Sequence, residues 1–213
     1  MTTESSPLFP PHAFSRHDET DDRSFYDQPR LVVHIDEAAI TALGAYFEHE
    51  LVKDGVILDL MSSWRSHLPK GLQKRKLVGL GLNEVEMAEN PQLDERVVHD
   101  INALPMLPFA DASFDAVVVT VSIQYLTRPI EVFREVNRVL KPGSAFHVVY
   151  SNRMFPAKAV AIWQALTDQQ RGELIKRYFE LSKGWSTSEW LDITPPSRHY
   201  TDPLFVVSAT RTT

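Results

Sequence analysis

The chain contains no cysteine among its 213 residues. This absence excludes a disulfide framework, a thiolate nucleophile and a zinc site built on cysteine. Apolar runs of membrane-spanning length are also missing, and the first residues lack the basic and apolar regions of a signal peptide. We therefore expect a cytoplasmic protein that makes no membrane contact.

An excess of basic charge is absent as well. The chain has 22 Lys and Arg against 28 Asp and Glu, which gives a formal net charge of -6. Phosphate binding needs a basic surface, so we expect no nucleic-acid partner. No pair of histidines has the helical spacing of metal ligands, and we expect no metal site. The length predicts one globular domain with a sizeable core, and it leaves the oligomeric state open.

Short apolar runs bounded by turn signals predict strands that are buried on both faces of a sheet. These runs lie at residues 56–60, 77–82, 97–100, 114–121, 144–150 and 204–209. Helical spacing of apolar residues marks 36–51 and a segment that begins at Pro129 and stops at Lys141-Pro-Gly143. Strands that alternate with helices predict a doubly wound, mostly parallel α/β sheet.

Composition divides the chain into segments. Residues 1–23 are rich in Ser, Pro, His and acids, which predicts a disordered N-terminal tail. Residues 24–52 are expected to form a helical lid, and residues 53–213 the main domain. Two helices are expected within 155–184, as an insertion before the last strands.

Polar residues stand where the predicted strands end. In such a sheet, ligands bind beyond the carboxyl ends of the strands. Asp59 ends the first strand, Asn83 and Glu84 follow the second, and Asp100 ends the third. A carboxylate that closes an apolar strand is costly to bury, which favours a functional role for Asp59 and, less strongly, for Asp100. The sequence therefore predicts a polar small-molecule site at this edge.

Three motifs carry a resemblance to a known family. They are Ile57-Leu-Asp59, then Leu107-Pro-Phe-Ala-Asp-Ala-Ser-Phe-Asp115, and Val139-Leu-Lys-Pro-Gly143. With Asp100 between them, these motifs resemble class I S-adenosylmethionine-dependent methyltransferases of the type 11 group, over about residues 54–152. The resemblance implies a seven-stranded Rossmann-like sheet with an antiparallel last strand. It also implies S-adenosylmethionine as cofactor, S-adenosylhomocysteine as product, and methyl transfer to an unidentified small-molecule acceptor.

A narrower resemblance covers most of the chain. Phe25-Tyr-Asp-Gln-Pro-Arg30, Asp59-Leu-Met-Ser-Ser-Trp64 and Gly79-Leu-Gly-Leu-Asn-Glu84 are similar to a little-described subgroup from plants and photosynthetic bacteria. That subgroup brings no substrate with it.

The family pattern assigns cofactor roles at matching positions. Asp59 falls near the methionine ammonium. Asp100 falls on the acid that binds the adenine amino group, with the backbone of Ile101 beside it. Ser122 and Gln124 lie on the segment that passes the methionine end of the cofactor.

The loop after Asp59 departs from the pattern, because Met61, Ser63 and Arg65 stand where relatives have three glycines. This cofactor has no phosphate, so such glycines serve close backbone approach and positive φ. Ser62 and Ser63 retain polar donors at the expected start of a helix, which Ser63 would cap. The N-terminus of that helix is expected to attract the cofactor carboxylate.

A second departure is Gly81, which stands where relatives place the acid for the ribose hydroxyls. Asn83 or Glu84 is expected to make that contact instead, with Asn83 better placed. The missing glycines and Gly81 favour an alternative function, a non-catalytic module of the same fold that binds a nucleoside-like effector or a protein partner. Asp59 and Asp100 oppose that alternative.

Three ring-bearing residues are further candidates. Trp64 is expected either to stack on a ligand or to pack as an ordinary core aromatic. His67 is a candidate general base, although a lone histidine near a helix start is more often satisfied locally. Tyr26 is a candidate to cover the cofactor from the lid, and packing into the core is an equal alternative.

Overall fold

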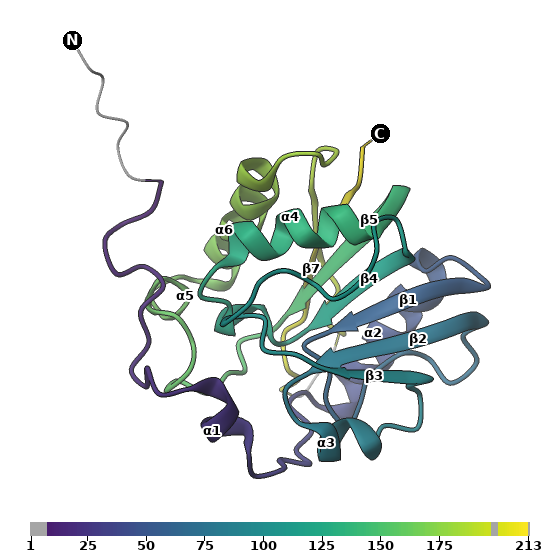
Figure 1. Cartoon of the computed structure of the whole chain (residues 1–213), viewed down its shortest axis with the longest axis horizontal. Coiled ribbons are helices and arrows are strands. Elements are labelled where there is room, and N and C mark those ends of the chain that lie inside the picture. Colours follow the sequence, from purple (N-terminus) through teal and green to yellow (C-terminus); the bar gives the residue numbers. More distant parts are fainter. Residues whose placement is uncertain (1–7, 197–199, 213) are drawn as a thin grey trace.

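The structure is a computed structural model, which describes residues 8–196 and 200–212. Within these residues, seven strands form one sheet in the order β3-β2-β1-β4-β5-β7-β6 (Figure 1). The strands are β1 (Gly55–Leu60), β2 (Lys74–Gly81), β3 (Glu95–Val98), β4 (Phe114–Thr120), β5 (Leu140–Tyr150), β6 (Glu189–Asp192) and β7 (Phe205–Thr210). The helices are α1 (Asp22–Tyr26), α2 (Glu37–Glu50), α3 (Glu84–Ala88), α4 (Pro129–Val139), α5 (Ala161–Gln164) and α6 (Asp168–Ser182), with a 3-10 turn η1 (Ile123–Tyr125).

Strand directions confirm the predicted fold class. β1 runs parallel to β2 and β4, β2 parallel to β3, and β4 parallel to β5. The last strand, β7, is antiparallel to both β5 and β6. The sequence did not predict β6, because this strand has four residues, none of them buried, and no continuous apolar run.

The strands bury side chains on both faces, which gives two cores. Leu58 and Val117 belong to the core beneath α4 and α6, whereas the neighbouring Ile57 and Val118 belong to the core beneath α2. All four side chains are fully buried. Figure 1 shows α4 and α6 on the near face of the sheet and α2 behind it. The continuous apolar runs follow from this double cover.

The N-terminal segment differs from the predicted disorder of residues 1–23. From residue 8 onward it packs on the body of the protein, and the first seven residues lie outside the described part. Phe9 and Phe14 contact Tyr178 of α6, with ring centroids 6.0 and 6.2 Å away. Two backbone N–H groups of α5 donate to carbonyls of the segment, each at 2.8 Å. Isolated aromatics in a polar stretch give no periodicity, so composition alone missed this contact.

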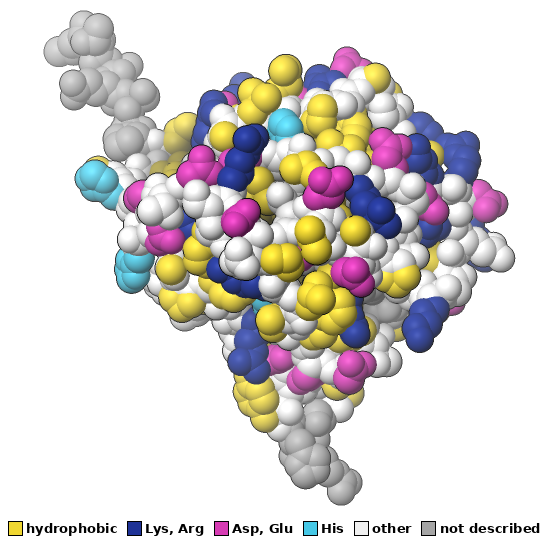
Figure 2. All heavy atoms as spheres, turned by 60° about the horizontal axis from the view of Figure 1, so that its bottom comes forward, with side chains coloured by type: hydrophobic (Ala, Val, Ile, Leu, Met, Phe, Trp, Pro, Cys, Tyr) yellow, Lys and Arg dark blue, Asp and Glu magenta, His cyan; other side chains and the backbone are white. Residues whose placement is uncertain are grey.

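Two further observations concern the charges on one face of the molecule and the length of its helices. On the face in Figure 2, lysine and arginine side chains are interspersed with acidic and apolar ones rather than gathered into one patch. Among the helices of the described residues, none combines the length and the apolar character needed to cross a bilayer.

Candidate functional site

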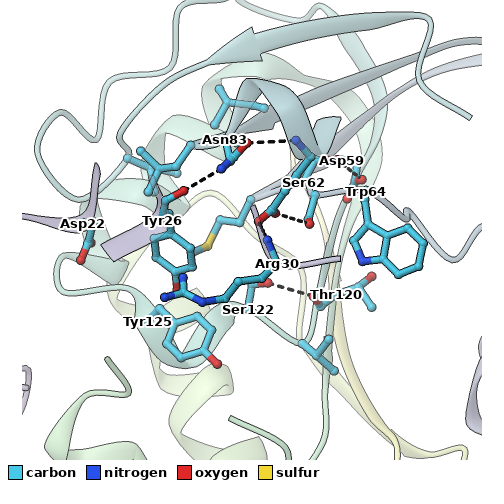
Figure 3. Close-up of a pocket in the computed structure, with 18 of the residues that line it drawn as sticks. Asp22, Tyr26, Arg30, Asp59, Ser62, Trp64, Asn83, Thr120, Ser122 and Tyr125 are labelled. Carbon is cyan, nitrogen blue, oxygen red and sulfur yellow. Dashed lines mark hydrogen bonds between the residues drawn. The ribbon is translucent and has the colours of Figure 1, made fainter. Parts of the chain in front are cut away.

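A cavity lies at the edge where the carboxyl ends of β1, β2, β3 and β4 meet. The segment from Asp22 to His34 forms its opposite wall (Figure 3). The predicted residues that line it are Tyr26, Asp59, Ser62, Ser63, Trp64, His67, Asn83, Asp100, Ile101 and Ser122. Two predicted residues lie outside the lining. Glu84 is exposed on α3, and Gln124 is buried with its amide donating to the carbonyls of Val121 and Arg153.

Asp59 is held by the serines that follow it. Its Oδ2 accepts the hydroxyl of Ser62 at 2.6 Å and that of Ser66 at 2.7 Å. Burial raises the pKa of Asp59 to about 6, although both hydroxyl donors act to lower it. The side chain is 3% exposed. The hydroxyl of Ser62 therefore orients the acid, and the serine-rich loop stabilises a carboxylate that its surroundings disfavour.

The loop between β1 and β2 corrects one prediction, because no helix begins there. Ser63 caps nothing and instead donates its hydroxyl to Glu86 Oε2 at 2.5 Å. The loop backbone is tied down where Ser62 N–H donates to the carbonyl of Leu80 at 2.8 Å. Serine hydroxyls that bond elsewhere compete with helix formation. The expected helix N-terminus for the cofactor carboxylate is therefore absent from this loop.

Gly81 and the glycine-free loop are one structural feature. A Cβ atom at Gly81 would lie 2.2 Å from the carbonyl oxygen of Ser62 and 3.2 Å from the sulfur of Met87. Atoms do not approach so closely, so the loop occupies the space that an acid would need. The close approach of the two segments therefore requires a glycine on β2, at Gly81, rather than in the loop.

The expected ribose contacts are arranged differently from the prediction. Asn83 caps α3 by accepting the N–H of Glu86 at 2.9 Å, and its amide donates to the carbonyl of Tyr26 at 2.7 Å. Glu86 lines the cavity and accepts the backbone N–H of Arg30 at 2.6 Å. The first turn of α3 therefore holds the Asp22–His34 wall of the cavity through Tyr26 and Arg30. Sequence reasoning missed Glu86, although its spacing of three residues from Asn83 is that of a helix-capping pair.

The acid at the end of β3 has a partly free carboxylate. Asp100 Oδ1 accepts the backbone N–H groups of Asn102 and Ala103, each at 3.0 Å. Within the described residues, Oδ2 accepts no hydrogen bond, which leaves an acceptor beside the apolar side chain of Ile101. An acceptor next to an apolar surface suits an amino-bearing ring.

The end of β4 carries an unpaired buried hydroxyl. Thr120 lines the cavity, and its Oγ1 has no partner among the described residues. The next residue, Val121, has φ 45°, which is costly for a β-branched side chain. Met61 and His67, with φ 59° and 56°, also line the cavity. Unpaired polar atoms and strained backbone are typical of ligand sites.

The two catalytic candidates have shifted pKa values. Burial, the Arg65 guanidinium and His34 lower the pKa of His67 to about 4, so its imidazole is neutral at pH 7. Burial raises the pKa of Tyr26 above its ordinary value, so the phenol keeps its proton and acts as a donor. Burial also lowers the pKa of His34, which lines the same cavity.

Trp64 contacts the segment that forms the opposite wall rather than lying free in the cavity. Its indole N–H donates to the carbonyl of Val32 at 3.0 Å, and the Arg65 guanidinium lies 4.3 Å from a ring centroid of Trp64. The ring lines the cavity, is half-buried and belongs to neither core, so its stacking on a ligand stays a prediction.

Comparisons with known proteins agree with this geometry. Residues 68–148, less than half of the chain, match the family model of the methyltransferase domain Methyltransf_11. No curated protein sequence is similar enough to count as a match.

Solved structures share the fold at low identity. The cyclase SpnF has 14% identity and a TM-score of 0.62, covering 89% of this chain and 91% of its own. An S-adenosylmethionine-dependent methyltransferase from Mesorhizobium loti has 18% identity and a TM-score of 0.56, with 82% and 98% covered. One from Aquifex aeolicus has 15% identity and a TM-score of 0.57, with 90% and 97% covered.

These similarities confirm the predicted Rossmann-like methyltransferase fold. The domain match supports a methyltransferase, the solved neighbours show the fold alone, and neither specifies an acceptor. Because a 4+2 cyclase has the same fold, the residues of the site must carry the argument for the reaction.

Proposed function

We propose that the protein transfers the methyl group of S-adenosylmethionine to a small-molecule acceptor within this cavity. The observation that carries the proposal is the convergence of Asp59, Asp100 and the unpaired Thr120 hydroxyl on one cavity of a methyltransferase fold. The narrower subgroup resemblance rests only on the three sequence motifs, and it adds no acceptor.

The residues present fit the cofactor at both of its ends. Asp100 Oδ2 and the apolar side chain of Ile101 suit an adenine ring with its amino group. Asp59, whose carboxylate is oriented by two serines, suits the methionine ammonium. The ribose hydroxyls lack the family's acid at Gly81, and Glu86 is the carboxylate of the cavity that lies on the following helix.

The sulfonium of S-adenosylmethionine supplies an activated methyl group, so the protein contributes mainly positioning and exclusion of water. The lid segment closes the cavity through backbone contacts with Asn83 and Glu86. His67 is neutral at working pH and is available to accept a proton from an acceptor hydroxyl. An imidazole with a pKa of about 4 is a weak base, which favours acidic hydroxyls or acceptors that need no base.

Calorimetry with S-adenosylmethionine and S-adenosylhomocysteine tests the proposal. We expect micromolar binding of both, and a loss of about tenfold, roughly 1.4 kcal/mol, on Asp100→Ala. Glu89→Gln, an exposed acid at the end of α3, is the matched control and leaves binding unchanged. A folded wild-type sample that binds neither compound would contradict the proposal and favour the non-catalytic alternative, in which a protein partner or another effector occupies the fold.

The state of His67 can be measured without knowing the acceptor. Because burial lowers its pKa to about 4, its ring resonances should stay constant from pH 8 to pH 5 in an NMR titration. The His67→Gln variant assigns these resonances by their disappearance. A titration midpoint near 6.5, the value of a solvated histidine, would show that the ring is open to water and is a stronger base.

A further inference from the structure

The cavity contains one half-buried cation that no carboxylate neutralises. Arg30 lines the cavity and forms no ion pair within residues 8–196 and 200–212. Among the described residues, its side chain makes one hydrogen bond, from Nη1 to the backbone carbonyl of Phe25, at 2.7 Å. The other lining arginine, Arg65, is exposed on the ring of Trp64. A planar guanidinium has five N–H donors, so most of those on Arg30 remain available.

Each carboxylate of the same cavity bonds to donors other than the Arg30 guanidinium, and among the described residues Asp100 keeps its Oδ2 open. Asp22 accepts from Arg16 at 2.7 Å and from Asn102 at 2.8 Å, and it pairs with Lys158 at 3.2 Å. The remaining three acids bond to serine hydroxyls or backbone N–H groups: they are Asp59, Glu86 and Asp100. Within the described residues, none of these four acids pairs with the guanidinium of Arg30.

Arg30 has contacts on several sides that fix the position of its side chain. Its backbone N–H donates to Glu86, and its guanidinium lies 4.1 Å from the ring centroid of Phe25 and 5.6 Å from those of Tyr26 and Phe155. In the view of Figure 3 its guanidinium lies between the rings of Tyr26 and Tyr125. A fixed guanidinium loses little entropy when it binds a carboxylate, and its fork matches the two oxygens.

We propose that Arg30 is the carboxylate receptor of this cavity. The inference rests on the proposed function, and it deepens that function by assigning the chemistry of a bound group. Two ligands can supply the carboxylate: the amino-acid end of the cofactor, or an acceptor that is itself a small carboxylic acid. The ring wall around Arg30, formed by Tyr26, Tyr125 and Phe155, suits an acceptor with an apolar or planar body.

Arg30→Met is the test variant, since it removes the charge and keeps a long apolar side chain. Arg23→Met is the matched control, because Arg23 is exposed on α1 of the same segment. The first measurement compares S-adenosylhomocysteine with 5′-methylthioadenosine, which lacks the carboxylate and the ammonium. If the cofactor supplies the carboxylate, Arg30→Met lowers the affinity for S-adenosylhomocysteine by tenfold or more and leaves the affinity for 5′-methylthioadenosine unchanged.

The second measurement uses paired acids and amides, from acetate and acetamide to benzoate and benzamide, followed by ligand-observed NMR. It is made with and without saturating S-adenosylhomocysteine. If the acceptor supplies the carboxylate, wild type and Arg23→Met prefer an acid over its amide by tenfold or more. Arg30→Met loses that preference, and Arg30→Lys retains part of it.

The proposal is overturned if Arg30→Met, shown to be folded by its melting temperature, changes neither S-adenosylhomocysteine affinity nor the preference for acids. Failure of the proposed function gives a different result. In that case wild type binds neither adenosine compound, while the acid preference measured without them still reports on Arg30.

Discussion

Asparagine in place of Asp59 raises the free energy of unfolding above pH 7, by about 3 kcal/mol, and weakens cofactor binding by tenfold or more. Burial raises the pKa of Asp59 from the usual 3.8 to about 6 in the folded protein. At about 1.36 kcal/mol per unit of pKa difference, this shift sets the size of the expected gain in the free energy of unfolding. The uncharged amide avoids the cost of burying the charge, and its oxygen still accepts from Ser62 and Ser66.

The pH dependence gives this prediction its sign. Below pH 3.8 the carboxyl is protonated in both states, so Asp59 costs no stability. As the pH rises toward 6, the unfolded chain ionises first, and wild type loses stability until the folded acid is ionised too. The gap between Asp59→Asn and wild type should therefore widen from pH 4 to pH 6 and stay constant above it.

Urea unfolding between pH 4 and pH 8 measures the gap, and calorimetry with S-adenosylhomocysteine measures binding. Asp27→Asn, at an exposed acid of the same cavity wall, should change stability by less than about 0.5 kcal/mol. If Asp59→Asn is no more stable than wild type at pH 8, the acid is better solvated than its burial indicates. A stabilised variant that has lost the ligand would show that Asp59 is kept for function at a cost in stability.

Much of the site could be predicted because it depends on strand ends. A parallel sheet brings its carboxyl ends to one edge, so Asp59, Asn83 and Asp100 were placed together by the pattern of apolar runs alone. Gln124 was predicted to face the cofactor, and no local sequence signal shows that its side chain points elsewhere. It lies in η1, where its amide faces backbone carbonyls of the body rather than the cavity.

The loop after β1 could not be predicted, because its structure depends on distant partners. Ser62-Ser63 before a polar stretch resembles a helix start, and the competing acceptor, Glu86, is 23 residues further along the chain. The side chain of Asn90 then donates to Ser66 Oγ and to the carbonyl of Ser63, each at 2.9 Å. Such contacts between segments override local preference, and a single sequence does not reveal them.

The two departures from the family pattern also have one cause, which the sequence presents as two. Read separately, the missing loop glycines and Gly81 each weaken the case for cofactor binding. In the structure, the loop lies so close to β2 that Gly81 is required beneath Ser62. The two changes therefore describe one rearranged pocket wall, and they are no longer independent evidence for loss of function.

Gly81→Ala is expected to destabilise the protein by about 3 kcal/mol, because the new Cβ would lie 2.2 Å from the carbonyl oxygen of Ser62. Moving the loop away would break two hydrogen bonds, because Ser62 is bonded to Leu80 through its N–H and to Asp59 through its hydroxyl. Gly71→Ala is the control, because nothing lies within 4 Å of a Cβ there, and urea unfolding should show it close to wild type. Gly81→Asp, which restores the family's acid, should lose stability as well and gain no affinity for S-adenosylhomocysteine. Equal stability of Gly81→Ala and Gly71→Ala would mean that the loop can move away from β2 to make room for the new Cβ. The missing loop glycines would then again be evidence against cofactor binding that is independent of Gly81.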